Sequence, residues 1–289
     1  MDIRNIRTNP PEIVNGNHLE RMFQLQKELM EHYIKIEGLP KYPININNKI
    51  GQSVLKDFSS RVIEETAEGY ESTSLALELL NKVGFNKSLL TDDDKQMILN
   101  HLQNSNEEQA DAIAFYLELF IYAGIDEEVI LTVVNELFKQ NLTCSDLLSK
   151  LMMIGSSITT EMGVLEPSKD LSCWELLSSS DFENHDKWLK VSSYIPAFHH
   201  NSIRFHEDTE SRMLWEVTYH LNLGRNYLKN KPWKQSGEMT NEKLYIIEIL
   251  LGFVKYLGYL SVMGFTPDTL YTLQYKKNQV NHFRIKSKY

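Results

Sequence analysis

The feature that most limits the fold of this chain is a helical spacing of apolar residues that recurs along most of its length. Within residues 18–36, for example, Met22, Leu25, Leu29 and Tyr33 lie three or four positions apart, so their side chains share one face of a helix. Glycine and proline, which mark the turns of strand-rich proteins, number only 13 and 8 among 289 residues. The sequence therefore predicts an all-α protein, a multi-helix bundle of about eight to ten helices.

The same spacing divides the chain into helical and irregular parts. It predicts further helices over 53–83, 107–123, 126–140, 144–160, 210–229, 241–263 and 267–283. Thr91 followed by Asp94 has the pattern of a capping box and predicts a short helix before residue 107. Residues 162–201 lose the periodicity. We therefore expect an N-terminal helical part (1–161), an irregular insert or hinge (162–201) and a C-terminal helical part (202–289) packed into the same bundle.

Composition limits the partners and the compartment. The 30 Lys and Arg residues against 39 Asp and Glu give a formal net charge of -9, which argues against nucleic acid as a partner. Cys144 and Cys173 are too few for a disulfide framework and form no CxxC pair. The polar N-terminal segment lacks the apolar core of a signal peptide, and the apolar runs at 246–251 and 257–263 are shorter than a membrane span of about 20 residues. We expect a cytoplasmic protein that binds neither nucleic acid nor membrane.

Two segments echo each other, each with an apolar helix, a glycine, a polar capping residue and a new helix. They are FYLELFIYAGIDEEVI at 115–130 and KYLGYLSVMGFTPDTL at 255–270. Glu108 and Glu248 lie at the same distance before the glycine, whereas Leu251 replaces Asp111. The pattern predicts a degenerate internal repeat whose second half has lost acids, and a chance likeness of two helical hairpins is the alternative.

Two acidic pairs indicate a metal site. Glu65 and Glu68 on one predicted helix, and Glu108 and Asp111 on another, are each three residues apart and therefore neighbours on a helix surface. If the two helices pack together, four carboxylates converge and repel one another unless a cation neutralises them. Mg²⁺ suits such a site, because it prefers oxygen ligands and bridges substrate phosphates.

Structural explanations for the same acids remain open. Glu64, Glu68 and Glu71 also match the solvated stripe of an amphipathic helix. Ser105 with Glu108 also matches a capping box. Neither acidic pair is specific alone, and the argument rests on their occurrence in this order on successive apolar helices.

The order Glu65-x-x-Glu68 and Glu108-x-x-Asp111 resembles the paired motif of the all-α nucleoside triphosphate pyrophosphohydrolases, which include the MazG proteins, the phage dCTPase-dUTPases and the dimeric dUTPases. LQKEL at 25–29 is similar to the first helix of the dimeric dUTPases, and KNQVNHFR at 277–284 is similar to their C-terminal helix. The resemblance covers most of the chain outside 162–201 and the extreme N-terminus.

The resemblance implies Mg²⁺-dependent hydrolysis of a deoxynucleoside triphosphate to the monophosphate and pyrophosphate. The implied substrate is dUTP, with dCTP or a modified pyrimidine nucleotide as the alternative, and the implied assembly is a homodimer in a bacterial or phage-infected cytoplasm. The implied site residues are Glu65, Glu68, Glu108 and Asp111 for Mg²⁺, with Glu65 also orienting the attacking water, Gln26 for the base or sugar, and Lys277, Asn281 and Arg284 for the triphosphate and sugar.

Two departures from the family pattern concern the base. Met30 stands where the dimeric dUTPases have Asn, and Ala114 stands where they tend to have His. Both positions are associated with the uracil pocket, so the departures weaken dUTP as the substrate and leave the phosphate chemistry intact. A non-catalytic nucleotide-binding or regulatory protein on the same fold is the alternative from another functional class.

Overall fold

The computed structural model describes residue 6 and residues 8–13, 17–84, 86–145, 147–161, 203–228 and 240–287. Every regular element in these ranges is helical, which confirms the all-α class for the part of the chain described. The helices are α1 (His18–Glu37), α2 (Lys49–Lys82), the short 3-10 turn η3 (Lys87–Leu89), α3 (Asp92–Ala123), α4 (Glu127–Phe138), α5 (Leu147–Glu161), α7 (Ile203–Tyr227), α8 (Glu242–Val262) and α9 (Pro267–Ser287).

The predicted boundaries of α3 were wrong. We expected a short helix after Thr91 and a separate one from residue 107, but a single helix runs from Asp92 to Ala123. The capping box at its start is confirmed, because the side chains of Thr91 and Asp94 each accept a hydrogen bond from the other's backbone N–H. The polar residues between 103 and 109 lie inside the helix.

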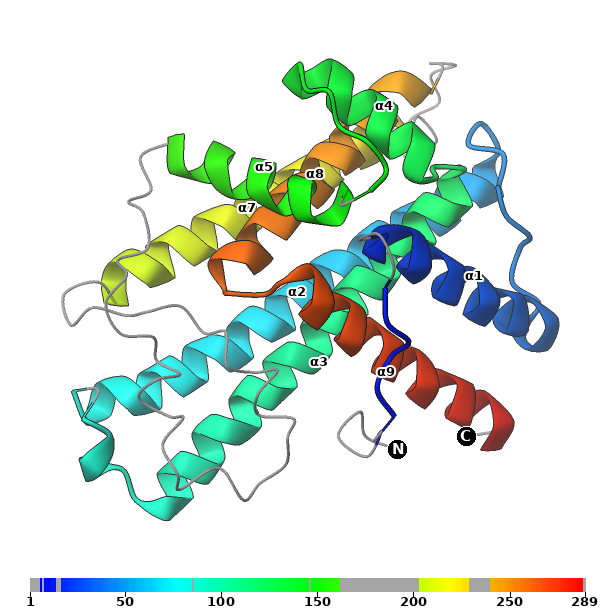
Figure 1. Ribbon diagram of the computed structural model, residues 1–289. Coiled ribbons are helices and arrows are strands. Elements are labelled where there is room, and N and C mark those ends of the chain that lie inside the picture. The colour runs from blue at the N-terminus through cyan, green and yellow to red at the C-terminus, as the bar shows by residue number, and fades with distance from the viewer. Residues whose placement is uncertain are drawn as a thin grey trace.

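Those polar residues join α3 to α2, which lies antiparallel beside it along most of its length (Figure 1). The Ser105 hydroxyl lies 2.8 Å from the Thr73 hydroxyl, and Asn104 Nδ2 donates to Ser72 Oγ at 2.8 Å. Ser105 is buried in mid-helix. The capping-box explanation of Glu108 is therefore wrong, and the polar run sets the register of the α2–α3 hairpin.

A second antiparallel pair, α7 and α8, packs on α2, and α5 crosses α8 (Figure 1). The backbones of α5 and α8 touch at two glycines. A Cβ atom added to Gly258 would overlap the backbone carbonyl group of Gly155, at a separation that real Cβ atoms do not show. Only glycine allows this approach, so the two residues fix where α5 crosses.

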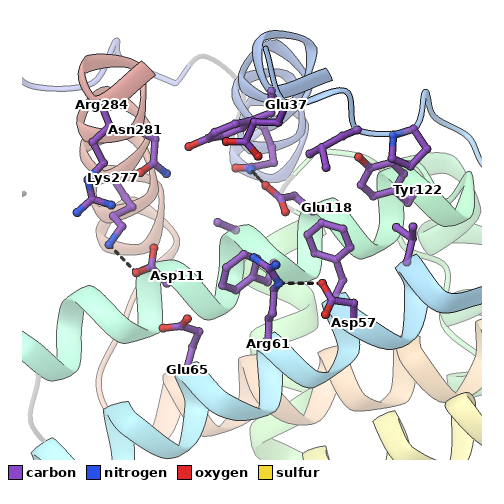
Figure 2. A pocket seen from close by; sticks show the side chains of 18 of the residues that line it. Glu37, Asp57, Arg61, Glu65, Asp111, Glu118, Tyr122, Lys277, Asn281 and Arg284 are labelled. Carbon is purple, nitrogen blue, oxygen red and sulfur yellow. Dashed lines mark hydrogen bonds and ion pairs between the residues drawn. The ribbon is translucent and has the colours of Figure 1, made fainter. Parts of the chain in front are cut away.

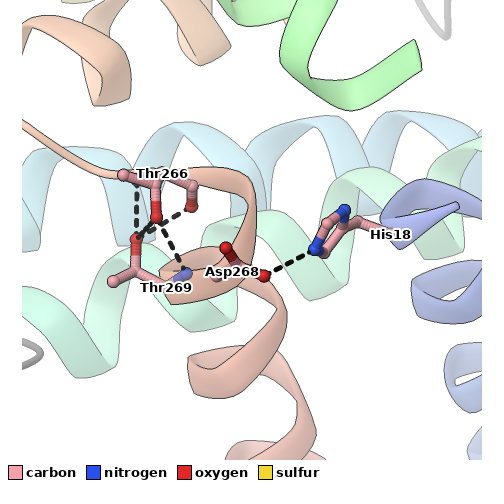
Figure 3. Close-up of polar contacts among 4 residues, drawn as sticks. All are labelled: His18, Thr266, Asp268 and Thr269. Carbon is pink, nitrogen blue, oxygen red and sulfur yellow. Dashed lines mark hydrogen bonds and ion pairs between the residues drawn. The ribbon is translucent and has the colours of Figure 1, made fainter. Parts of the chain in front are cut away.

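The first and last helices, α1 and α9, lie side by side and run parallel. The start of α9 is capped by Thr266 and Thr269, whose side chains accept each other's backbone N–H groups (Figure 3). His18 Nε2 at the start of α1 lies 2.8 Å from Asp268 Oδ1 (Figure 3). These contacts hold the two helix starts together and aim both helices over α3.

Aromatic rings join the parts of the chain on either side of the predicted insert. Tyr116 of α3 stacks on Tyr256 of α8 at 5.4 Å between ring centroids, and Phe120 meets Phe253 edge-on at 5.0 Å. All four side chains are fully buried in one core that draws on α1 to α5 and α7 to α9. The insert predicted at 162–201 and Cys173 lie outside the described residues.

The apolar runs at 246–251 and 257–263 form one continuous helix, not two short segments. By length and composition, α8 could cross a membrane, but 67% of its most apolar window is buried inside the protein. A core helix of a globular domain gives the same signal, so α8 is weak evidence for a membrane span.

Candidate functional site

A cavity of about 740 Å³ opens between α1, α2, α3 and α9. Six of the residues predicted for the site line it: Gln26, Glu65, Asp111, Lys277, Asn281 and Arg284 (Figure 2). The other two, Glu68 and Glu108, adjoin it through their contact with Glu65. Side chains far apart in the sequence are therefore brought to one place by the packing of four helices.

Three of the predicted metal ligands form a cluster. Carboxylate oxygens of Glu65, Glu68 and Glu108 all lie within 4.8 Å of one another. The approach of α2 to α3 at this point depends on Gly69, because a Cβ atom there would overlap the side-chain amide of Gln109. Gln109 is fully buried and its Oε1 accepts a hydrogen bond from the Tyr256 hydroxyl at 2.6 Å, so it has little room to move.

The carboxyl groups of Glu65 and Glu108 share a hydrogen bond, and the pKa of each lies above its ordinary value. Burial is the main cause that raises the pKa of Glu65, to about 8, and the negative charge of Asp111 and a hydrogen bond with Glu108 add to it. Burial also raises the pKa of Glu108, while its hydrogen bond with Glu65 opposes that rise. Burial and the neighbouring acids therefore favour the neutral form at this pair of carboxyls.

The fourth predicted ligand has a different neighbour. Asp111 Oδ2 lies 2.5 Å from Lys277 Nζ of α9, and both side chains are largely buried. Asp111 does not belong to the cluster of three acids, although its charge reaches Glu65. Burial raises the pKa of Asp111, and the Lys277 ammonium opposes the rise. The predicted quartet is therefore three acids together and one acid held by a lysine.

The polar residues predicted on α9 share the face that looks into the cavity. Lys277, Asn281 and Arg284 project from one side of α9 (Figure 2). Two buried amides of α9 anchor this helix to α1, because Gln274 Nε2 donates to the Met22 carbonyl at 3.2 Å and Asn278 Nδ2 donates to the Leu25 carbonyl at 2.9 Å. The cationic face is thus fixed by bonds that the sequence did not reveal.

The opposite end of the cavity is aromatic. The Phe58 ring lies 5.2 Å from the Tyr122 ring and 6.1 Å from the Phe115 ring, measured between centroids. The Arg61 guanidinium lies over the rings of both phenylalanines, at 5.6 and 5.4 Å, and its Nε donates to Asp57 Oδ2 at 3.0 Å. Flat rings with one cation among them suit a planar ligand.

One acid stands among these rings. Glu118 is only 9% exposed, and its Oε1 accepts a hydrogen bond from Gln26 Nε2 at 2.7 Å. Burial is the main cause that raises the pKa of Glu118, to about 7, while the bond from Gln26 and the charge of Arg61 oppose it. Gln26 was predicted to contact the base or sugar. One of its two amide hydrogens is instead donated to Glu118.

Sequence reasoning missed Arg61, Phe115 and Glu118. A signal for them was present in their spacing. Arg61 lies four residues before Glu65, and Phe115 and Glu118 lie four and seven residues after Asp111, so all three share helix faces with predicted ligands.

Neither the family models, nor the curated proteins, nor the solved structures compared with this chain gave a match.

Proposed function

We propose that this protein is a Mg²⁺-dependent pyrophosphohydrolase of deoxynucleoside triphosphates, of the all-α type, converting a pyrimidine dNTP and water to the monophosphate and pyrophosphate. One observation carries the proposal. A single cavity has clustered carboxylates and the cationic face of α9 at one end and aromatic rings at the other. A nucleoside triphosphate has the matching order of chemical groups, with anionic phosphates at one end and a flat base at the other.

The acidic cluster is suited to a divalent cation. Carboxylate oxygens of Glu65, Glu68 and Glu108 lie within 4.8 Å of one another, and Mg²⁺ prefers oxygen ligands of this kind. Burial and the nearby acids raise the pKa of Glu65, and a positive charge at that point would favour its ionised form. Asp111 would join the ligands once Lys277 turned to an anionic phosphate.

Magnesium, when bound, supplies positive charge to the phosphates and lowers the pKa of water. The side chains would do the rest. Glu65 would orient the attacking water and accept its proton as the ionised carboxylate. Lys277 and Arg284 would neutralise the triphosphate, and Asn281 would add an amide hydrogen bond. Phe58, Phe115 and Tyr122 would enclose the base.

The proposal is tested by incubating the protein with dUTP, dCTP, dTTP, dATP and dGTP in turn, with Mg²⁺ or with EDTA, and measuring pyrophosphate and monophosphate. We expect equal amounts of both products with Mg²⁺ and none with EDTA. Orthophosphate as the first product would indicate cleavage at another bond and would refute the proposal. Tight nucleotide binding without any product would favour the non-catalytic alternative.

A further inference from the structure

A buried acid stands at the end of the cavity remote from the phosphate-binding side chains. Glu118 is two helical turns beyond Asp111 on α3, a rise of about 10 Å along the axis. Figure 2 shows it on the other side of the cavity from Lys277 and Arg284. Its negative charge would repel a phosphate, so its partner must be another part of the ligand.

A chain of amides fixes how this acid is presented. Gln274 Nε2 donates to Gln26 Oε1 at 3.3 Å, so the amide nitrogen of Gln26 faces Glu118 and donates to its Oε1. Within the described part of the chain, no hydrogen bond reaches Glu118 Oε2. Oε1 is therefore held by Gln26, and Oε2 is left to accept a hydrogen bond from a ligand in the cavity.

The surroundings of this free oxygen are those of a base-binding pocket. The rings of Phe58, Phe115 and Tyr122 line the same end of the cavity and offer flat apolar surfaces to a base. A carboxylate oxygen in such a setting that accepts no hydrogen bond is unfavourable, so a ligand that brings an N–H group to Glu118 Oε2 gains a strong interaction.

We propose that Glu118 reads the base and selects a 4-aminopyrimidine, as in cytosine, over uracil. An ionised carboxylate only accepts hydrogen bonds, and the exocyclic amine of cytosine donates two. Uracil has a carbonyl oxygen at the same position, which a carboxylate repels. The amine is also the polar group of the base farthest from the sugar and phosphates, which matches the distance of Glu118 from α9. This inference rests on the proposed function and names its substrate.

Binding of the α,β-imido analogues of dCTP and dUTP, measured by titration calorimetry with Mg²⁺ at pH 8, tests the inference without turnover. We expect the wild-type protein to bind the dCTP analogue at least about tenfold more tightly. In Glu118→Gln, the amide oxygen of the new side chain can accept the hydrogen bond from Gln26. Its amide nitrogen then faces the cavity as a hydrogen-bond donor. The preference should disappear or reverse. The matched control is Glu28→Gln, which removes an exposed acid of α1 that does not line the cavity and should leave the order of the two analogues unchanged.

Two results would overturn the role of Glu118 while leaving the proposed function intact. One is equal or tighter binding of the dUTP analogue by the wild-type protein, which needs no variant to fold. The other is a loss of affinity in Glu118→Gln by the same factor for both analogues. Failure to bind either analogue, with no pyrophosphate from any dNTP, would instead refute the proposed function.

Discussion

Replacing Glu118 by Gln should stabilise the protein at pH 8 and leave its stability nearly unchanged at pH 4.5. Burial raises the pKa of this carboxyl from 4.5 to about 7 in the folded protein. Each tenfold change in an ionisation constant corresponds to about 1.4 kcal/mol, so this rise corresponds to roughly 3 kcal/mol. The side chain is buried, so solvent screening reduces the figure little.

The sign follows from proton binding. Between pH 4.5 and 7 the unfolded chain releases the Glu118 proton while the folded protein retains it, so the wild-type free energy of unfolding falls as the pH rises through this window. The penalty is complete above pH 7 and absent below pH 4.5. Glutamine does not ionise, and its amide oxygen can accept the bond from Gln26, so the variant escapes the penalty.

Urea denaturation at pH 4.5, 6, 7 and 8 in EDTA measures the difference between variant and wild type. At pH 8 we expect a gain of about 3 kcal/mol, or a rise in Tm of roughly 5–10 °C. Glu37→Gln, which removes an exposed acid, should show no such trend. A difference that does not depend on pH, or one that favours the wild type at pH 8, would refute the account of Glu118 as a buried acid under strain. A gain would show that the protein keeps a destabilising acid in its cavity, as functional sites often do.

Three further outcomes test the site and the fold. Glu68→Gln and Asp111→Asn should each lower pyrophosphate release by at least about 100-fold. Glu71→Gln, an exposed acid one turn further along α2, should have little effect. Activity that survives in both of the first two variants would mean that the wrong acids were chosen. Lys277→Met should raise KM for the nucleotide about tenfold, because a cation that binds phosphate is lost. The same change should tighten Mg²⁺ binding in calorimetry, because Asp111 loses the ammonium that competes with Mg²⁺. Weaker Mg²⁺ binding would contradict this competition between Lys277 and Mg²⁺. Gly258→Ala should lower the free energy of unfolding by about 1–3 kcal/mol, because the new Cβ meets the Gly155 backbone. Urea denaturation measures the change, with Ser157→Ala at an exposed position of α5 as the control. An unchanged midpoint would show that α5 and α8 separate freely.

Helix positions could be predicted from apolar spacing because burial of one face decides most of them. The prediction failed within α3, where a new helix was expected to begin at residue 107. Ser105 and Gln109 lie on either side of that position. Both are buried and hydrogen bonded across helices, to Thr73 and Tyr256. Polar partners on another helix leave no trace in local periodicity, so a buried polar stretch and a loop have similar sequences.

The acids and the cationic face of α9 could also be proposed from spacing, since each set lies on one face of one helix. The base end of the cavity could not. In the sequence, Glu118 is an ordinary polar interruption of an apolar helix. Its orientation depends on a hydrogen bond from Gln26, 92 positions away, which in turn accepts one from Gln274. The departures at Met30 and Ala114 pointed to an altered base pocket, and Glu118 supplies a physical reason to expect cytosine there.

The predicted echo between the two halves extends to contacts. A glycine of the first helix packs against an acid of the second in both hairpins: a Cβ atom added to Gly69 would lie 3.5 Å from Glu108 Cβ, and one added to Gly224 would lie 3.6 Å from Glu248 Cβ. In each hairpin, the residue four positions before the glycine forms a hydrogen bond with the acid that packs against that glycine. The pairs are Glu65 with Glu108 and, at 2.8 Å, His220 with Glu248.

The two hairpins differ in the kind of side chain that each acid meets. In the α7–α8 hairpin, Glu248 meets an imidazole, and Glu216 lies 2.7 Å from the ammonium of the buried Lys255. Each of these two acids therefore has a basic side chain of the protein beside it. The α2–α3 hairpin has the same close helix approach but offers Glu65 in place of the imidazole. The acids of the α2–α3 hairpin raise one another's pKa, so the cation that we propose there would relieve a repulsion that basic side chains already offset in the α7–α8 hairpin.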